Sequence, residues 1–182
     1  ENPFPALEFI TSKGTIVVEL NRNRAPATVN NFLRYVLDGH YNNTIFHRVI
    51  PEFVVQGGGY TPELVERPVR EPVINESGNG LPNLRTTIAM ARTQDPHSAG
   101  TQFFINVVNN VNDDPSTANL DPLKHTVQGR WGYTVFGRVV EGMDVVDLIA
   151  QYETEPNGPG GAPLPIIPVI IENMKRVQPG QE

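Results

Sequence analysis

The sequence of 182 residues contains no cysteine and a single tryptophan. Without cysteine the chain forms no disulfide, has no thiol nucleophile and offers no thiolate ligand to a metal. It also lacks an apolar run near the roughly 18 residues that a membrane-spanning helix needs. These absences exclude thiol enzymes, cysteine-ligated metal centres and helical membrane proteins, and they leave the redox compartment open.

Basic residues are also scarce, with 14 Lys and Arg against 20 Asp and Glu and a net charge of −6. Nucleic acids and anionic membranes both favour basic surfaces, so we expect neither as a partner. The four histidines show no metal-ligand spacing, and the sequence has neither a G-x-S-x-G nor an H-E-x-x-H motif. We therefore expect no metal, no cofactor and no hydrolase chemistry.

Glycine and proline are frequent, with 16 and 17 residues, which favours a loop-rich β protein over a helical bundle. Short runs rich in Val, Ile, Thr and Phe, bounded by turn residues, predict β-strands. We expect strands at Leu7–Thr11, Thr15–Leu20, Thr44–Val49, Phe53–Gln56, Thr86–Ala91, Gln102–Val107, Trp131–Val140 and Ile166–Val177, and a short one near Glu71–Ile74. The intervening turn Ser12-Lys13-Gly14 predicts a hairpin between the first two.

Two segments have helical periodicity. Apolar residues spaced by three and four, following a proline, predict an amphipathic helix at about Pro26–Asp38, and Met143–Gln151 fits a shorter helix. Glu153–Pro165 looks like a linker, and no repeat or domain boundary is evident. We therefore expect one domain over residues 1–182, with its core at about 7–177, built as a mainly β, closed antiparallel barrel with helices over its ends.

The stretch Phe46–Gly59 is central, because it combines a permanent cation with an amide and several apolar side chains. Pro51 marks a corner between two strands, and three glycines end the second strand. Across this corner Arg48 would lie close to Phe53 and Gln56. A guanidinium above an apolar floor, with an amide beside it, makes a poor core and a plausible site.

The default interpretation of a lone arginine such as Arg48 is an exposed or salt-bridged side chain. Phe53, Val54 and Phe104 would be unusual neighbours for a purely solvated charge, and they favour a functional role. The adjacent His47 points to the opposite side of a strand. We interpret His47 as a partly buried, hydrogen-bonded structural histidine.

Five segments of the sequence, in order, resemble the cyclophilin family of peptidyl-prolyl cis-trans isomerases. They are Phe46–Gly59, Met90–Arg92, Gly100–Asn106, Val135–Val139 and Glu141–Asp144. The resemblance extends from about residue 7 to residue 177 and is strongest to the bacterial members. It implies a closed eight-stranded antiparallel β-barrel capped by two α-helices, with a proline-binding groove on its outer face.

The same resemblance assigns roles to individual residues. Arg48 would be the catalytic arginine, and the backbone of Ala91 and Arg92 would align a peptide like an added strand. The expected substrate-binding residues are Phe53, Val54, Gln56, Ala91, Arg92, Gln102, Phe104, Leu120 and Tyr133. No metal ligand is implied.

This chain departs from the family pattern at several places. Val54 replaces a methionine that is common in the family, and Tyr133 stands where many members have a pocket histidine. Leu120 would supply the pocket leucine, although the loop before it is longer than usual. The tryptophan that helps many eukaryotic members to hold cyclosporin A is replaced by Asn119, and Trp131 lies too close to the next strand to substitute for it.

The resemblance implies an enzyme that accelerates X–Pro bond rotation in peptides and in unfolded or flexible proteins, and so assists folding. An alternative is a proline-peptide-binding or chaperone module with little turnover, motivated by Val54, Tyr133 and the long Asn109–Arg130 loop. A ligand-carrying barrel is a third, weaker alternative, which a filled barrel interior would exclude.

Further expectations concern partners and location. We expect weak binding of cyclosporin A and a monomeric chain. The sequence begins at Glu1 and lacks cysteine, which together favour the periplasm of a Gram-negative bacterium, with the cytoplasm as the alternative.

Overall fold

The computed structural model describes residues 2–111, 119–122 and 130–177. The elements of this part of the chain are β1 (Ala6–Thr11), β2 (Gly14–Leu20), α1 (Pro26–Leu37), β3 (Thr44–Ile45), β4 (Arg48–Ile50), β5 (Val54–Gly57), β6 (Thr87–Met90), β7 (Phe103–Asn106), β8 (Val135–Glu141), α2 (Met143–Ala150), β9 (Thr154–Glu155), a 3-10 turn (Pro159–Gly161), β10 (Leu164–Pro165) and β11 (Ile170–Arg176). Neither α1 nor α2, the α-helices of these residues, has the length and apolar character to cross a membrane.

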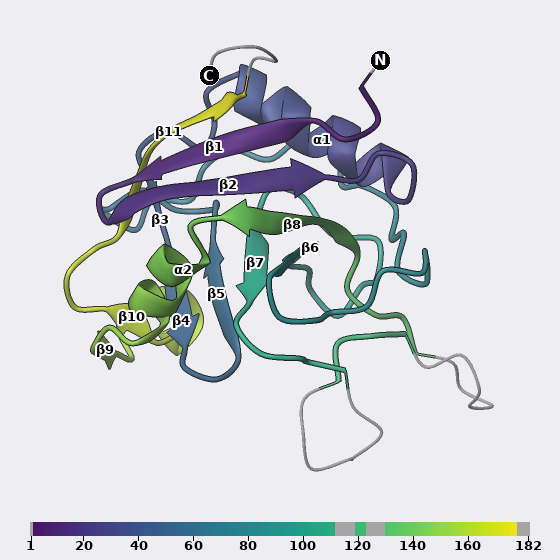
Figure 1. Cartoon of the computed structure of the whole chain (residues 1–182). Coiled ribbons are helices and arrows are strands. Elements are labelled where there is room, and N and C mark those ends of the chain that lie inside the picture. Colours follow the sequence, from purple (N-terminus) through teal and green to yellow (C-terminus); the bar gives the residue numbers. More distant parts are fainter. Residues whose placement is uncertain (1, 112–118, 123–129, 178–182) are drawn as a thin grey trace.

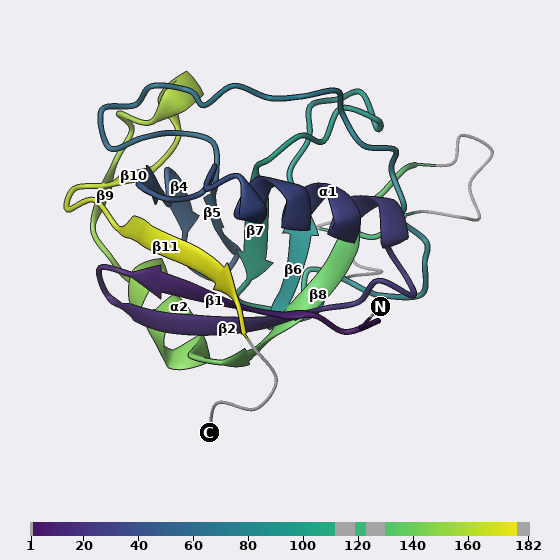
Figure 2. The ribbon, with the colours of Figure 1, turned by 90° about the horizontal axis from the view of Figure 1, so that it is seen from above.

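Nine strands form one strongly curled antiparallel sheet, in the order β3-β11-β1-β2-β8-β6-β7-β5-β4 (Figure 1). Seen from above, α1 lies across one end of the curled sheet, and α2 lies at the other end (Figure 2). The predicted fold, a mainly β antiparallel barrel capped by two helices, is confirmed in these features.

The predicted single strand at Thr44–Val49 is wrong in one respect, because the structure divides it into β3 and β4. β3 pairs with β11 and β4 pairs with β5. The strands at the two edges of the sheet, β3 and β4, are therefore consecutive along the chain. Between them, the N–H of Phe46 donates to the carbonyl of Val169 at 3.1 Å. Counted as one interrupted strand, β3 and β4 give the eight strands expected of the barrel.

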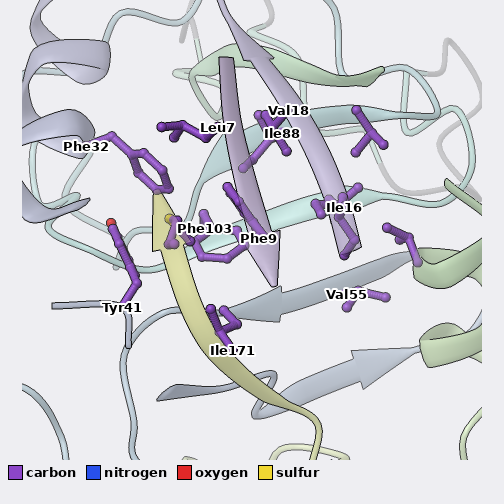
Figure 3. Close-up of a cluster of buried hydrophobic side chains, with 14 of the residues drawn as sticks. Leu7, Phe9, Ile16, Val18, Phe32, Tyr41, Val55, Ile88, Phe103 and Ile171 are labelled. Atoms are coloured by element: carbon purple, nitrogen blue, oxygen red, sulfur yellow. The ribbon is translucent and has the colours of Figure 1, made fainter. Parts of the chain in front are cut away.

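The interior of the sheet is filled by side chains. Alternate residues of β1 and β2, among them Leu7, Phe9 and Ile16, are fully buried, as the alternation of apolar residues predicts (Figure 3). Phe32 of α1 stacks on Tyr41, with ring centroids 4.7 Å apart, and packs on the core rings. This filled interior excludes the ligand-carrying barrel.

Helix α1 begins and ends as the sequence predicts. Pro26 is in its first turn, and Gly39, just beyond the helix, has a left-handed φ of 69°. The cap of its N-terminus comes from a distant loop, because the Glu76 carboxylate accepts from the N–H groups of Ala27 and Thr28 at 3.1 and 2.8 Å and from the Thr28 hydroxyl. This cap was not predicted from the sequence.

Some predicted boundaries need correction. Glu71–Ile74 is no strand and contributes one bridge, between Val73 and Ala99. The strand predicted from residue 131 begins at Val135, and the supposed linker contains the β9–β10 pair. Most of the long 109–130 loop lies outside the described residues.

Candidate functional site

A cross-strand row on the outer face of the sheet carries the candidate site. Arg48 of β4 lies opposite Gln56 of β5, Gln56 lies opposite Phe104 of β7, and Phe104 lies opposite Ala89 of β6. Directly opposed residues share one face of a sheet. The next row, one residue along each strand, is buried in the barrel core and consists of Val49, Val55, Ile105 and Ile88. The pleat therefore turns Arg48 outward while its neighbours hold the strand in place.

This row opens into a pocket of about 300 Å³. The pocket is lined by Arg48, Phe53, Val54, Gln56, Ala91, Arg92, Phe104, Leu120 and Tyr133. These are nine of the ten residues that the sequence nominated. The tenth, Gln102, lines an adjoining cavity of about 380 Å³ that shares Gln56, Ala91 and Arg92 with the first. The structure thus brings the nominated residues together.

The polar edge of the pocket is a chain of amides that ends on Arg48. The Arg48 guanidinium donates to the Gln56 side-chain oxygen at 3.2 Å, and the Gln56 amide donates to the Gln102 oxygen at 3.1 Å. Within residues 2–111, 119–122 and 130–177 no carboxylate forms an ion pair with Arg48. A guanidinium carries several N–H donors, so Arg48 retains donors for a ligand. The salt-bridged interpretation of Arg48 is therefore wrong for the described residues.

The floor and walls of the pocket form a small apolar cluster separate from the barrel core. Val54 and Phe104 are 2% and 4% exposed, and Phe53, Leu120 and Tyr133 pack against them half-buried. The rings of Phe104 and Tyr133 meet edge to face, with centroids 5.7 Å apart. The guanidinium carbon of Arg48 lies 5.9 Å from the centre of the Phe53 ring. A cation thus borders a cavity whose floor is apolar.

Arg92 contributes more than its backbone. Its guanidinium lies 4.5 Å from the centre of the Tyr133 ring and donates to the carbonyls of Trp131 and Gly132. This side chain therefore holds one wall of the pocket, a role that sequence reasoning missed. The Ala91 N–H already donates to the Gln102 carbonyl at 2.9 Å, so this amide is not available to align a peptide.

His47 lies behind the site and is more completely buried than predicted, at 3% exposure. Its ring meets that of Tyr60 edge to face at 4.8 Å. Burial lowers the pKa of His47 from 6.5 to about 4, the nearby Arg48 cation adds to this effect, and a hydrogen bond to Gln102 opposes it. His47 is therefore a neutral ring at pH 7.

Sequence reasoning also missed Asn83, Asn106 and Asn110, which are buried directly beside the pocket. The one feature of the sequence that could have pointed to these residues is that Asn106 ends an otherwise apolar strand. Trp131 is 48% exposed and packs on His97, and it is absent from the pocket lining.

Comparisons with known proteins find similar sequences. The chain is 52% identical over 169 residues to the peptidyl-prolyl cis-trans isomerase cyp18 of Streptomyces antibioticus, covering 93% of this chain and 96% of the relative. It is 51% identical over 150 residues to the peptidyl-prolyl cis-trans isomerase B of Escherichia coli K12, covering 82% and 87%.

Solved structures share the fold. A crystal structure of a cyclophilin type peptidyl-prolyl cis-trans isomerase of Cryptosporidium parvum has a TM-score of 0.72 at 24% identity and covers 96% of this chain and 98% of its own. Another, determined in the presence of the dipeptide Ala-Pro, has a TM-score of 0.71 at 23% identity and covers 95% and 99%. Finally, the model of the cyclophilin type peptidyl-prolyl cis-trans isomerase/CLD family matches residues 6–176. The chain belongs to the cyclophilin-type peptidyl-prolyl cis-trans isomerase family.

Proposed function

We propose that this chain catalyses cis-trans isomerisation of X–Pro bonds in peptides and in unfolded or flexible proteins, and so assists their folding. The observation that carries the proposal is the Arg48 guanidinium at the edge of a pocket of about 300 Å³ whose floor is apolar. The names of the relatives, and the neighbouring structure determined in the presence of Ala-Pro, support a proline-containing substrate.

The reaction needs no nucleophile, because no covalent bond is broken. Resonance gives the peptide bond a rotation barrier of roughly 18–20 kcal/mol, and rotation returns the lone pair to the prolyl nitrogen at the twisted state. A guanidinium N–H of Arg48 is suited to donate to that nitrogen without losing its proton. This interaction is stronger in the twisted state than in either planar state, which is the requirement for catalysis.

The remaining residues hold the substrate and aim the cation. Val54, Phe104 and Leu120 form the apolar surface against which a pyrrolidine ring would pack while the residue before proline rotates. Gln56 fixes one side of the guanidinium, and Gln102 fixes Gln56. The apolar surroundings strengthen the effect of the Arg48 charge because they lower the local dielectric constant.

A protease-coupled assay on an X–Pro peptide tests the proposal. Arg48→Ala should lower kcat/KM about a hundredfold, the range observed when a preorganised donor is removed. The matched control is Arg138→Ala, since Arg138 is a largely exposed arginine of β8 that pairs with Glu19. Equal rates for wild type and Arg48→Ala would reject the proposal. Tight binding of the peptide with unaltered cis-trans exchange by NMR would instead favour the binding or chaperone module.

We propose weak cyclosporin A binding as well, because Asn119 stands where many eukaryotic members have an indole, and the indole of Trp131 packs on His97. Calorimetric titration checks this expectation, and a nanomolar Kd would contradict it. The monomeric state and the periplasmic location remain predictions, to be checked by light scattering and by cell fractionation.

A further inference from the structure

Three asparagine side chains lie buried side by side next to the pocket. Asn83, Asn106 and Asn110 are 0%, 0% and 3% exposed. The Asn110 amide donates to the Asn106 oxygen at 2.8 Å, and the Asn106 amide donates to the Asn83 oxygen at 3.1 Å. We call these three residues the asparagine cluster.

The other contacts of the asparagine cluster reach the main chain of the pocket walls and two side chains beside them, since Asn83 donates to the Asp121 carboxylate at 2.8 Å and Asn106 donates to the Thr87 hydroxyl at 2.9 Å. Asn110 donates to the carbonyl of Phe53 at 3.1 Å, and Asn83 donates to the carbonyls of Leu120 and Tyr133 at 3.2 and 3.3 Å. Main-chain bonds complete the arrangement, since the Leu120 N–H donates to the Asn110 carbonyl at 2.9 Å. Three walls of one pocket are therefore joined through three neighbouring amides.

These walls lie outside the strands of the sheet. Phe53 precedes β5, and Leu120 and Tyr133 lie in irregular segments outside every strand of the described chain. Besides the cluster, single main-chain bonds hold them, since the Val107 N–H donates to the Phe53 carbonyl and the Tyr133 N–H donates to the Leu120 carbonyl. By contrast, Arg48, Gln56 and Phe104 lie on β4, β5 and β7 and are fixed by strand pairing.

The chemistry of the cluster is unusual for its surroundings. Burying an amide is unfavourable unless its hydrogen bonds are made, and an apolar side chain of similar size would pack at such a place without that requirement. In β7, Asn106 follows Phe103, Phe104 and Ile105, all buried. Three amides at this one place point to a requirement for directed bonds, which Asn83 and Asn110 make to the wall carbonyls and Asn106 connects by bonding to both of them.

We propose that the asparagine cluster positions the walls of the proline pocket, and thereby sets the affinity for the prolyl ring independently of the arginine. This inference rests on the proposed function. Asn83, Asn106 and Asn110 are positioning residues, because they act through the walls and do not line the pocket. The ring packs against the walls in the planar and in the twisted state alike, so weaker walls should lower both affinities equally.

The test is steady-state kinetics on an X–Pro peptide, together with the Kd of the same peptide from an NMR titration. Asn110→Ala removes the donors to Phe53 and Asn106 and should raise KM and Kd about tenfold, with kcat within about twofold of wild type. Asn110→Ser keeps one short donor and should give an intermediate KM. If Asn110→Ala does not fold, the KM and Kd of Asn110→Ser test the inference in its place.

Asn42→Ala is the matched control. The Asn42 oxygen accepts from the N–H of Met174 in β11, away from the pocket, so its loss should lower stability without changing KM. An Asn110→Ala variant with a lower melting temperature and a lower apparent kcat, but with the KM and Kd of wild type, would overturn the inference and leave the cluster a purely structural role.

The Kd separates this inference from the proposed function. If wild type binds the peptide but does not isomerise it, the proposed function fails, and a tenfold higher Kd for Asn110→Ala still supports the role of the cluster. If wild type neither binds nor isomerises the peptide, both proposals are overturned.

Discussion

Arg48 and Gln56 face one another across the β4–β5 pair, and the Arg48 guanidinium donates to the Gln56 side-chain oxygen at 3.2 Å. An amide oxygen orients a guanidinium without neutralising it, whereas a carboxylate would compete with the substrate for the positive charge. Because Gln56 donates in turn to Gln102, the direction of the cation is set by two neutral side chains.

Gln56→Leu should lower kcat about tenfold. Leucine keeps much of the volume of glutamine but accepts no hydrogen bond, so the Arg48 guanidinium loses its fixed orientation, and a lost hydrogen bond to a charged group is worth about 1.5–3 kcal/mol. The measurement is the protease-coupled assay at saturating peptide. Gln151→Leu, at the exposed C-cap of α2, is the control. An unaltered kcat in Gln56→Leu would show that the guanidinium is held without this amide.

Gly59→Ala should impair catalysis while leaving the fold intact. A Cβ atom at residue 59 would lie 2.7 Å from the Cγ and Nε2 atoms of Gln102. This clash is with a flexible side chain, which moves away, so Gln102 should lose its contact with Gln56 and kcat/KM should fall several-fold. A double-mutant cycle provides the check, because Gly59→Ala should have no further effect in a Gln102→Ala background. An equal further loss of kcat/KM in the Gln102→Ala background would show that Gly59→Ala does not act through Gln102.

Glu76→Ala should destabilise the chain by about 1 kcal/mol, the usual effect of losing a helix cap. Ala25, at the N-cap of α1, provides no side-chain cap, and the Glu76 carboxylate supplies the missing acceptor from the other side of a long loop. Urea unfolding measures the loss. Isomerase activity of the folded fraction should not change, because Glu76 lies outside the residues that line the pocket. A midpoint equal to that of wild type would show that water replaces the carboxylate without loss.

The sequence predicts those parts of the fold and site that depend on local pattern. Leu7 and Phe9 alternate with half-buried residues because one face of β1 is in the core, and the alternation is visible in the sequence. Arg48 and Gln56 could be nominated together because a single tight corner connects their strands.

Other features depend on contacts between distant segments and could not be predicted in this way. The strand at residues 44–50 divides because its hydrogen-bond partner changes from β11 to β5, which no local propensity encodes. Asn83 has nothing unusual in its own neighbourhood, and its role emerges from carbonyls 37 and 50 residues away along the chain. The contribution of the Arg92 side chain likewise depends on Tyr133, which comes from a separate segment.

The stability of the chain should fall in mild acid in part because of His47. Burial lowers the pKa of the folded His47 to about 4, from an ordinary value of 6.5 that the unfolded chain retains. Between these values the unfolded chain binds more protons than the folded chain, so the free energy of unfolding decreases as the pH falls through this window and levels off below about 4. Linkage gives a loss of about 2 kcal/mol from this group between about pH 7 and about pH 5.

Urea unfolding of wild type and His47→Gln at both pH values tests this expectation. Glutamine does not titrate, so the variant should lose about 2 kcal/mol less stability than wild type over the same interval, even if it is less stable at pH 7. The comparison between the two proteins removes the contribution of His40, whose pKa is also lowered by burial and which both proteins retain. Equal pH dependence in both proteins would mean that His47 is protonated to the same degree in the folded and unfolded chains, and would contradict its burial as a neutral ring behind Arg48.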